Sequence, residues 1–378
     1  MKPKMNILFL TGTRADYGKI KVLIDSVINS DNYSASIFVT GMHMLSLYGS
    51  THEEISDNHS DDVEIYKFIN QNLSSTMDET LAKTVLGLSD YVKEYKPDKI
   101  VIHGDRVETL AGVIVASLNN IPSIHIEGGE VSGTIDELIR HAVSKMATIH
   151  CVSNDEAMSR LLQMGENEDK IRVIGSPDVD VMLSEELPTL DVVKAHYDIN
   201  FNEYGLLLFH PVTTEVDQIE SQINTLINAI CKSKINVIVI FPNNDLGSIQ
   251  IINAYKNLPQ NFHILPSMRF EFFITLLKNS SLIIGNSSAG VREAPYFGVP
   301  TINVGTRQND RSIAPSVLNI EGFEEDTLAE KIIEISKVSF PPSAMFGSIG
   351  TADRFMEMLN NFDSSELGVQ KYFINLKD

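Results

Sequence analysis

The chain is poor in cysteine and contains no long apolar run. Only Cys151 and Cys231 are present among its 378 residues, and both lie in apolar segments typical of a core. This pattern excludes a disulfide framework and favours a reducing compartment, so we expect a cytoplasmic protein. The longest apolar stretches, such as Val237–Phe241 and Gly205–Phe209, are far shorter than the ~20 residues of a membrane span, and the first residues lead into a strand without an export signal.

The chain also has few basic residues relative to its acidic residues. The chain has 30 lysines and arginines against 50 aspartates and glutamates, which gives a formal net charge of −20. Such a charge excludes a nucleic-acid partner, because binding DNA or RNA depends on a basic surface that neutralises phosphates. An anionic ligand would have to be held locally, by a few arginines, backbone N–H groups and helix N-termini.

The chain does have the length and the patterning of two α/β domains. Its 378 residues exceed one ordinary core. Short β-rich runs that are apolar on both faces alternate with amphipathic stretches, which is typical of parallel strands covered by helices. The predicted strands are Asn6–Thr11, Ser34–Thr40, Lys99–His103, Ser123–Ile126 and Ile149–Val152 in the first half, and Tyr204–Phe209, Asn236–Phe241, Asn261–Leu265, Ser281–Gly285 and Pro300–Val304 in the second. We therefore predict two Rossmann-like doubly wound domains with a cleft between them.

The boundary between the domains is predicted from a break in this pattern. The segment Leu183–Leu190 is polar, contains a proline and has no sustained period. We expect an N-terminal domain over 1–183 and a C-terminal domain over 190–350, followed over 351–378 by a helix and tail that pack back on one of them. Two such domains usually close around a ligand, so we expect the linker to flex.

The end of the first predicted strand has a glycine turn with two cations. Thr11-Gly-Thr-Arg-Ala-Asp-Tyr-Gly-Lys19 opens into a helix, with Arg14 and Lys19 near its start. In open α/β sheets, ligands bind beyond the carboxyl ends of the strands, and a turn of this kind can hold a phosphate group. A plain β–α connection with a surface arginine is the alternative, and the turn alone does not exclude it.

Three carboxylates follow in the same half of the chain. Asp105 and Glu127 come directly after predicted strands, and Asp136 stands at the start of the next helix. Carboxylates that meet in one cleft suit proton transfer at carbon, because one can act as base while another acts as acid. As alternatives, Asp105 and Asp136 could cap helices, and Glu127 could pair with Arg14.

A metal site is a further alternative at these two strand ends, since each combines a histidine with a carboxylate. His103 stands two residues before Asp105, and His125 two residues before Glu127. Neither pair has the helical spacing or the companion thiolate that is typical of zinc sites. We therefore predict neither a metal nor another cofactor.

The second half has a small-residue loop of its own. Gly285-Asn-Ser-Ser-Ala-Gly290 joins a strand to a helix that we predict to run to Phe297. Small residues let backbone N–H groups approach a phosphate, and the serines add hydroxyl donors. Glu293 could then accept both hydroxyls of a ribose, and Arg307 ends the next strand. An ordinary N-capped helix is the alternative, although it needs one serine and no flanking glycines.

These segments together resemble the hydrolysing UDP-N-acetylglucosamine 2-epimerases of bacterial sialic acid synthesis. The likeness runs from about Met5 to Arg311. It rests on Thr11-Gly-Thr-Arg-Ala-Asp-Tyr-Gly-Lys19, Val39-Thr-Gly-Met-His43, His103-Gly-Asp-Arg106, His125-Ile-Glu-Gly-Gly129, Gly175-Ser-Pro-Asp178, His210-Pro-Val-Thr-Thr-Glu215 and Gly285-Asn-Ser-Ser-Ala-Gly-Val-Arg-Glu-Ala-Pro295.

The resemblance implies a GT-B architecture and a metal-independent reaction of UDP-N-acetylglucosamine with water, which gives UDP and N-acetylmannosamine. UDP would leave by elimination to a 2-acetamidoglucal, to which water adds. Asp105, Glu127 and Asp136 match the family's catalytic carboxylates, without a division into acid and base. The matching nucleotide and sugar contacts are Arg14, Lys19, Arg106, Arg140, His210, Asn243, Ser287, Ser288, Gly290, Glu293 and Arg307, with Arg269 and Phe270 where the family holds the uracil.

Several related functions stay open. The non-hydrolysing epimerases have Arg-Pro-Glu in place of Arg14-Ala-Asp16 and an alanine in place of Gly128, which favours the hydrolysing branch. A close relative in that branch acts on UDP-N,N′-diacetylbacillosamine, and the motifs do not separate the two substrates. A GT-B glycosyltransferase and a non-catalytic UDP-sugar sensor are more distant alternatives. The glycosyltransferase needs only one base, so three carboxylates exceed its need, and the sensor leaves the cluster of carboxylates unexplained. The family resemblance further implies a homodimer or homotetramer.

Overall fold

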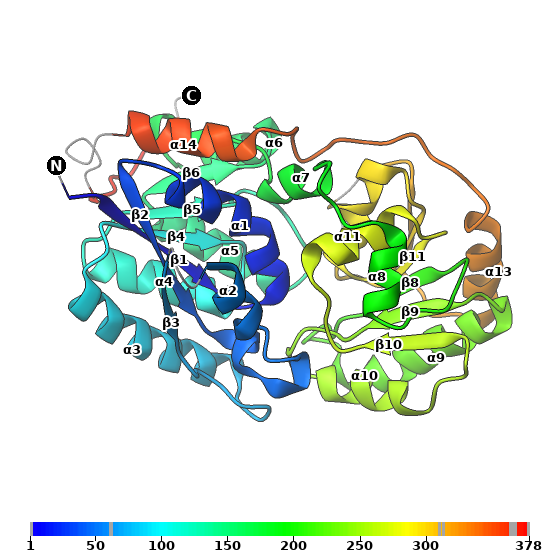
Figure 1. Ribbon diagram of the computed structural model, residues 1–378. Coiled ribbons are helices and arrows are strands. Elements are labelled where there is room, and N and C mark those ends of the chain that lie inside the picture. Colours follow the sequence, from blue (N-terminus) through cyan, green and yellow to red (C-terminus); the bar gives the residue numbers. More distant parts are fainter. Residues whose placement is uncertain (1–2, 60–62, 309–310, 312–313, 363–368, 376–378) are drawn as a thin grey trace. The chain divides into compact units, whose positions relative to one another are not determined.

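The computed structural model describes residues 3–59, 63–308, 311, 314–362 and 369–375. The chain divides into two compact units (Figure 1). Unit 1 comprises Met1–Glu130, Asp136–Leu183 and Phe346–Asp378, and unit 2 comprises Val131–Ile135 and Ser184–Met345. The short segment Val131–Ile135 is thus an excursion of the first half of the chain into unit 2.

Unit 1 is built on a seven-stranded parallel sheet with the strand order β3-β2-β1-β4-β5-β6-β7. The strands are β1 (Met5–Thr11), β2 (Tyr33–Val39), β3 (Glu64–Lys67), β4 (Lys99–His103), β5 (Ser123–Ile126), β6 (Ile149–Val152) and β7 (Ile171–Val173). The five strands predicted for this half are therefore confirmed. The two strands that were not predicted, β3 and β7, form the edges of the sheet.

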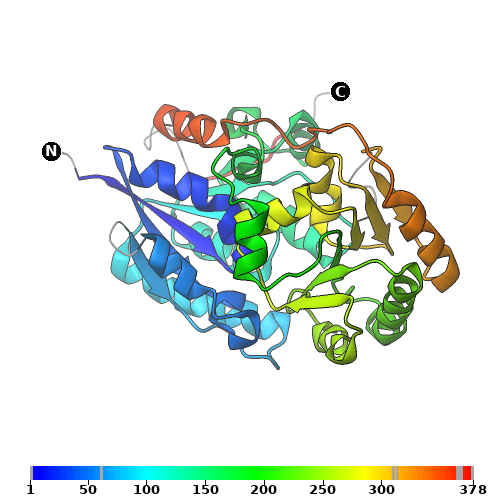
Figure 2. The same ribbon diagram turned by 45° about the vertical axis from the view of Figure 1, so that its right-hand side comes forward.

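Helices cover both faces of this sheet (Figure 1, Figure 2). They are α1 (Arg14–Ile28), α2 (His52–His59), α3 (Met77–Tyr95), α4 (Val107–Leu118), α5 (Ile135–Met146), α6 (Asp155–Gln163), α7 (Pro177–Met182) and α14 (Thr351–Asn361). α1 buries Ile20, Leu23, Ile24 and Val27 at the spacing of one helical face, and this face packs on the central strands.

The C-terminal helix α14 belongs to unit 1. Its Phe355, Met358 and Leu359 lie in the same core as α1. The carboxylate of Asp180 on α7 accepts hydrogen bonds from the first backbone N–H groups of α14, at Gly350 (2.7 Å), Thr351 (3.0 Å) and Ala352 (2.9 Å). These N–H groups have no partner inside the helix, so α7 supplies the cap that α14 lacks.

Unit 2 repeats the plan with six parallel strands in the order β10-β9-β8-β11-β12-β13. Its strands are β8 (Gly205–Leu208), β9 (Val237–Ile240), β10 (Phe262–Leu265), β11 (Ile283–Gly285), β12 (Thr301–Val304) and β13 (Val317–Ile320), and its helices are α8 (Leu190–His196), α9 (Ile219–Ser233), α10 (Ser248–Ala254), α11 (Phe270–Lys278), α12 (Ser288–Val291) and α13 (Glu325–Ile335). All five strands predicted for this half are confirmed, and only the edge strand β13 was missed. Among the described residues, no helix has the length and apolarity needed to cross a membrane.

Candidate functional site

The strand orders mark one place in each sheet where a ligand can be received. In unit 1 the order reverses between β1 and β4, and in unit 2 it reverses between β8 and β11. Loops from such neighbouring strands leave in opposite directions, so a crevice opens beyond their carboxyl ends. The segments between these four strands and the strands that follow them, helices included, hold nine of the sixteen site residues predicted from the sequence.

Asp105 lies in the turn after β4 and is bound by a buried arginine. The Arg140 guanidinium, which is 1% exposed, donates to the Asp105 carboxylate and, over 3.1 Å, to the Glu130 carbonyl. Burial lowers the pKa of Arg140, but the charges of Asp105, Glu130 and Asp136 raise it above its usual value, so the guanidinium stays charged. The helix α4 begins after Arg106, whose own side chain does not cap it, and the capping alternative for Asp105 stays a prediction.

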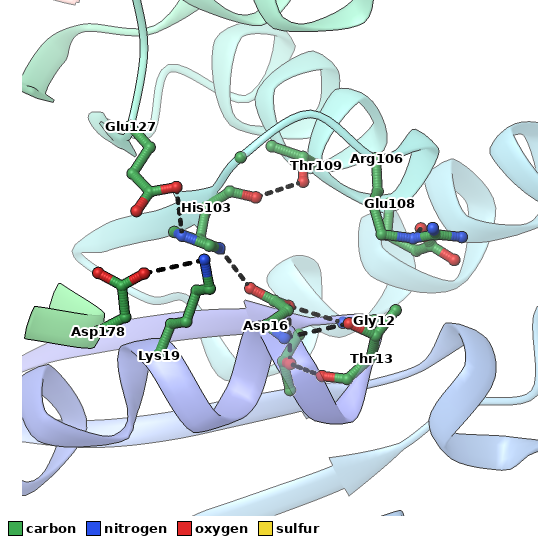
Figure 3. Close-up of polar contacts among 12 residues, drawn as sticks. Gly12, Thr13, Asp16, Lys19, His103, Arg106, Glu108, Thr109, Glu127 and Asp178 are labelled. Atoms are coloured by element: carbon green, nitrogen blue, oxygen red, sulfur yellow. Dashed lines mark hydrogen bonds and ion pairs between the residues drawn. The ribbon is translucent and has the colours of Figure 1, made fainter. Parts of the chain in front are cut away.

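Glu127 follows β5, the neighbour of β4, and its backbone is in a conformation that glutamate rarely adopts. Its φ angle is +64°, and its side chain is buried. Its Oε2 lies 3.3 Å from His103 Nε2 (Figure 3), and its Oε1 accepts a hydrogen bond from the Ser176 hydroxyl. A left-handed non-glycine residue costs about 1–3 kcal/mol and is concentrated at functional sites.

Asp136 lies in the first turn of α5 and is not its cap, which overturns the capping alternative. It precedes Arg140 by four residues, so the two side chains share one face of the helix. Because Arg140 contacts Asp105, the helix α5 places the charge of Asp136 in the same neighbourhood. In the part of the chain that the structure describes, no cluster of three or more His, Cys, Asp or Glu residues has a metal-binding arrangement.

The predicted cations of unit 1 are each held by a carboxylate. Arg14 Nε lies 2.6 Å from Glu54, and Lys19 Nζ lies 3.0 Å from Asp178. Arg14 thus has a partner on α2, and its alternative pairing with Glu127 stays a prediction. Arg106 Nε lies 3.4 Å from Glu108, a residue buried beside the glycine turn after β1 (Figure 3).

In unit 2, a pair of reciprocal hydrogen bonds joins the loops after β8 and β11. Asn286 Oδ1 accepts from the His210 N–H over 2.6 Å, and Asn286 Nδ2 donates to the His210 carbonyl over 2.8 Å. The His210 ring in turn accepts from the backbone N–H of Asn243 at its Nδ1, over 3.0 Å. The predicted contact residues His210 and Asn243 are thus bonded to each other, and Asn286, which holds His210, was not singled out from the sequence.

The small-residue loop after β11 has a tighter geometry than we predicted. Gly285 has a φ of +126°, and a Cβ there would collide with the Leu208 carbonyl, so only glycine fits. Ser287 caps α12 by accepting from the Ala289 N–H over 3.3 Å. The expectation of one helix to Phe297 is wrong, because α12 ends at Val291 and a 3-10 turn, Ala294–Phe297, follows. Pro295 explains this break, since it has no N–H and its ring would clash with the carbonyl four residues earlier.

Arg307, at the end of β12, is directed back to this loop. Its guanidinium donates to the Asn286 carbonyl over 3.3 Å, and the Gln308 amide donates to the same oxygen over 3.1 Å. Arg307 also accepts at its own carbonyl from the Gly133 N–H over 3.1 Å, which attaches the excursion Val131–Ile135 to unit 2.

The remaining predicted contacts of unit 2 lie in or next to two helices, and Ser288 is the first residue of one of them, α12. Glu293 is 2% exposed and follows α12, and Gly290 lies inside α12, where a Cβ would come 2.7 Å from the Thr301 methyl group. Phe270 is buried at the start of α11, and the guanidinium of Arg269 lies 6.0 Å from the centre of the Phe272 ring. That distance is at the outer limit of a cation–π contact.

Three comparisons with known proteins agree with this architecture. A family model described as UDP-N-acetylglucosamine 2-epimerase matches residues 26–360. The chain is 41% identical over 376 residues to a UDP-N-acetylglucosamine 2-epimerase of Neisseria meningitidis serogroup B, with 98% of this chain and 99% of that protein covered. It is 34% identical over 361 residues to the UDP-N,N′-diacetylbacillosamine 2-epimerase (hydrolyzing) of Legionella pneumophila, with 93% and 95% of the two chains covered.

A comparison with solved structures gives the same family of folds. The chain is similar to the crystal structure of Methanocaldococcus jannaschii UDP-GlcNAc 2-epimerase in complex with UDP-GlcNAc and UDP, with a TM-score of 0.80 at 21% sequence identity over 94% of this chain and 99% of the other. This likeness confirms the predicted GT-B-like α/β fold of two Rossmann-like domains. On the match over residues 26–360 and the identity of 41%, the chain belongs to the UDP-N-acetylglucosamine 2-epimerase family.

Proposed function

We propose that the protein is a hydrolysing UDP-N-acetylglucosamine 2-epimerase that supplies N-acetylmannosamine for sialic acid synthesis in the cytoplasm. UDP leaves the substrate by elimination across C1–C2, and water then adds to the 2-acetamidoglucal. Asp105, Glu127 and Asp136 perform the proton transfers. The proposed substrate contacts remain those named from the sequence, with the loops after β8, β11 and β12 holding the nucleotide.

The observation that carries this proposal is the pair of carboxylates on neighbouring strand ends of unit 1. Asp105 follows β4 and is held by Arg140, whereas Glu127 follows β5 and is held by His103 and Ser176. β4 and β5 pair directly in the sheet. Two carboxylates with separate partners suit an elimination followed by a hydration, because one removes a proton and another returns one.

The nucleotide half of the proposal rests on the loops of unit 2. Glycine at 285 lets the backbone turn sharply into Ser287 and Ser288, whose hydroxyls and N–H groups suit a phosphate. Arg307 adds a cation close to this loop through its bond to the Asn286 carbonyl. A net charge of −20 makes such a local cation important, because the protein as a whole repels an anionic ligand.

The hydrolysing branch is favoured by the environment of Gly128. A Cβ at this position would lie 2.9 Å from both His125 Nδ1 and Ser144 Oγ, closer than real Cβ contacts come. The alanine that the non-hydrolysing enzymes have here therefore requires a different arrangement beside Glu127. The Legionella pneumophila relative is also named as a hydrolysing enzyme.

A second candidate substrate is UDP-N,N′-diacetylbacillosamine. The observation that favours it is the 34% identity to the Legionella pneumophila enzyme named for that substrate. The higher identity of 41% to the Neisseria meningitidis enzyme favours UDP-N-acetylglucosamine.

Product analysis with both UDP-sugars side by side tests the proposal. We expect free UDP and N-acetylmannosamine from UDP-N-acetylglucosamine, with no added acceptor, and deuterium at C2 of the product in deuterated water. Accumulation of UDP-N-acetylmannosamine alone would assign the non-hydrolysing reaction. Faster turnover of the bacillosamine derivative would assign the second substrate, and turnover that needs an acceptor would assign a glycosyltransferase.

A further inference from the structure

The His103 side chain joins two carboxylates at the switch point of unit 1. It stands at the end of β4, where its Nδ1 lies 2.8 Å from Asp16 Oδ1 and its Nε2 lies 3.3 Å from Glu127 Oε2 (Figure 3). A neutral imidazole has one N–H and one acceptor nitrogen, so it can serve only one carboxylate well. With a carboxylate on each side, the doubly protonated ring fits the site.

Asp16 is held by further donors of the glycine turn. The Thr11 hydroxyl donates to its Oδ2 over 2.8 Å, and the Gly12 N–H donates to the same oxygen over 3.1 Å (Figure 3). These donors orient the side chain so that its other oxygen, Oδ1, lies within reach of an N–H donor at His103 Nδ1.

The charges around His103 favour the cation. Burial lowers the pKa of His103, but Glu127 and Asp16 raise it to about 10. His125 on the adjacent strand β5 shows the opposite case: it faces the Gly104 carbonyl and the Ser144 hydroxyl, and burial lowers its pKa to about 3.

A second ion pair lies on the same elements. Lys19, one turn after Asp16 on α1, is neutralised by Asp178 on α7 at 3.0 Å. The Asp16–His103–Glu127 chain therefore has a net charge of −1 when the ring is protonated and −2 when it is neutral. The charges of Asp16 and Glu127 therefore favour the protonated His103 ring.

We propose that His103 is a positioning residue whose imidazolium keeps Glu127 ionised and oriented, so that Glu127 enters the reaction as the base. This inference rests on the proposed function. Ser176 supports the same state, because its hydroxyl donates to the other oxygen of Glu127.

The step that this assigns to Glu127 is removal of the C2 proton. The C2–H bond breaks, its proton moves to a Glu127 oxygen, and its electron pair forms the C1–C2 double bond. The C1–O bond breaks in turn, and its pair leaves on the β-phosphate oxygen of UDP. A protonated Glu127 could not accept this proton, so its ionisation sets the lower pH limit of the reaction.

The charge of His103 can be measured without turnover. In the intact protein labelled with ¹³C and ¹⁵N at histidine, we expect the His103 ring to stay doubly protonated from about pH 6 to 9, where ordinary histidines lose their charge. Asp16→Asn removes one of the two carboxylates, so the His103 pKa falls. A wild-type ring that titrates near 6.5 would overturn the inference.

The effect on Glu127 is measured by the pH dependence of kcat/KM. His103→Gln removes the neighbouring positive charge, which raises the Glu127 pKa, so the acidic limb moves up by roughly one to three pH units. We expect kcat to fall about 10–100-fold, as for other outer-shell partners, with little change in KM.

His150→Gln is the matched control. His150 is a buried histidine on β6 whose Nε2 lies 3.0 Å from Glu166, another carboxylate. Because it touches no proposed catalytic group, its loss should leave the acidic limb in place even if stability falls. A folded His103→Gln variant with an unshifted limb overturns the inference alone. Failure of the wild-type protein to convert either UDP-sugar overturns the proposed function instead.

Discussion

At the scale of single residues, Glu127 combines three features that have no structural benefit. It is buried, its carboxyl group is ionisable, and its φ is +64°, a region that glycine occupies without strain. Its neighbours His103 and Ser176 supply polar partners for the buried carboxyl group, whereas the backbone conformation stays strained. A residue held this way is expected where chemistry requires a carboxylate at one fixed position.

The first prediction concerns Asp105. Asp105→Asn keeps an oxygen for Arg140 but removes the charge that proton transfer requires, so kcat should fall on the order of 10²–10⁴-fold. UDP affinity, measured by calorimetry, should stay close to wild type because the proposed nucleotide contacts are elsewhere. The control is Asp155→Asn, an exposed aspartate in the first turn of α6. A variant that retains full turnover would remove Asp105 from the reaction.

The second prediction concerns Gly128. Gly128→Ala places a methyl group 2.9 Å from His125 and from Ser144, which bond to each other over 3.1 Å. Such overpacking should lower the free energy of unfolding by about 1–3 kcal/mol in denaturant titration. Gly322→Ala is the control, because no atom lies within 4 Å of the added Cβ. Equal stability of the two variants would show that the site adapts.

Candidate site residues could be predicted from the sequence where they directly follow a predicted strand. Asp105 and Glu127 could be predicted because parallel strands end at a common edge. Their partners could not, because Arg140 stands 35 residues from Asp105 and Ser176 stands 49 residues from Glu127. The positive φ of Glu127 has no signature in its residue type.

At the scale of elements, most of the predicted strands are buried on both faces, although the half-buried edge strand β10 was predicted as well. β4 is buried at all five positions, and a continuous apolar run reveals it. The missed strands are sheet edges with weaker patterns: Ile171-Arg-Val173 exposes two of its three residues, and Glu64–Lys67 exposes both ends. Edge strands face solvent in part, so neither hydrophobic run nor alternation distinguishes them from a loop.

The third prediction concerns the start of α14. Asp180→Ala removes the carboxylate that accepts from Gly350, Thr351 and Ala352, so these three N–H groups lose their acceptor. We expect unfolding to become easier by about 1–2 kcal/mol. Asp353→Ala, an exposed aspartate in the first turn of the same helix, should cost less because it affects only the helix dipole. Thermal melts of both variants and of the wild type measure this difference. A similar loss for both would show that Asp180 acts only through its charge near the helix dipole and not as a hydrogen-bond acceptor.

The fourth prediction concerns acid stability around Glu166. This buried carboxylate lies 2.7 Å from Lys145 Nζ and 3.0 Å from His150 Nε2, and it accepts from Lys371 of the C-terminal tail. Burial raises the Glu166 pKa, but the three donors lower it to about 2.

The sign of the effect follows from that depressed pKa. Ionised Glu166 stabilises the fold at pH 7, and this contribution disappears as the pH falls from about 4.5 to about 2. Glu166→Gln should therefore reduce the free energy of unfolding by about 2–3 kcal/mol at pH 7 and by much less near pH 2. A pH-independent difference in urea titrations would contradict this assignment.

At the scale of the whole molecule, the chain separates two tasks between two units. The proposed proton-transfer groups Asp105, Glu127 and Asp136 all belong to unit 1, and the small-residue loop after β11 belongs to unit 2. Each unit has its own parallel sheet and its own hydrophobic core. The sequence predicted two such units from the restart of the strand pattern. It did not predict the excursion Val131–Ile135, because its attachment depends on a backbone hydrogen bond at Gly133.

The final prediction follows from this division of tasks. A fragment of residues 184–345 contains all six strands of the second sheet and all the proposed uracil and phosphate contacts of unit 2, so it should fold and bind UDP without converting any UDP-sugar. UDP at a hundred times its Kd should stabilise the fragment by about 2.7 kcal/mol, seen as a rise in Tm.

Arg307→Ala should reduce this rise in Tm, whereas Lys256→Ala, at an exposed position, should not. If the fragment folds and UDP leaves its Tm unchanged while the full chain binds UDP, the nucleotide depends on unit 1 as well, and the assignment of the phosphate to the Gly285–Gly290 loop alone is wrong.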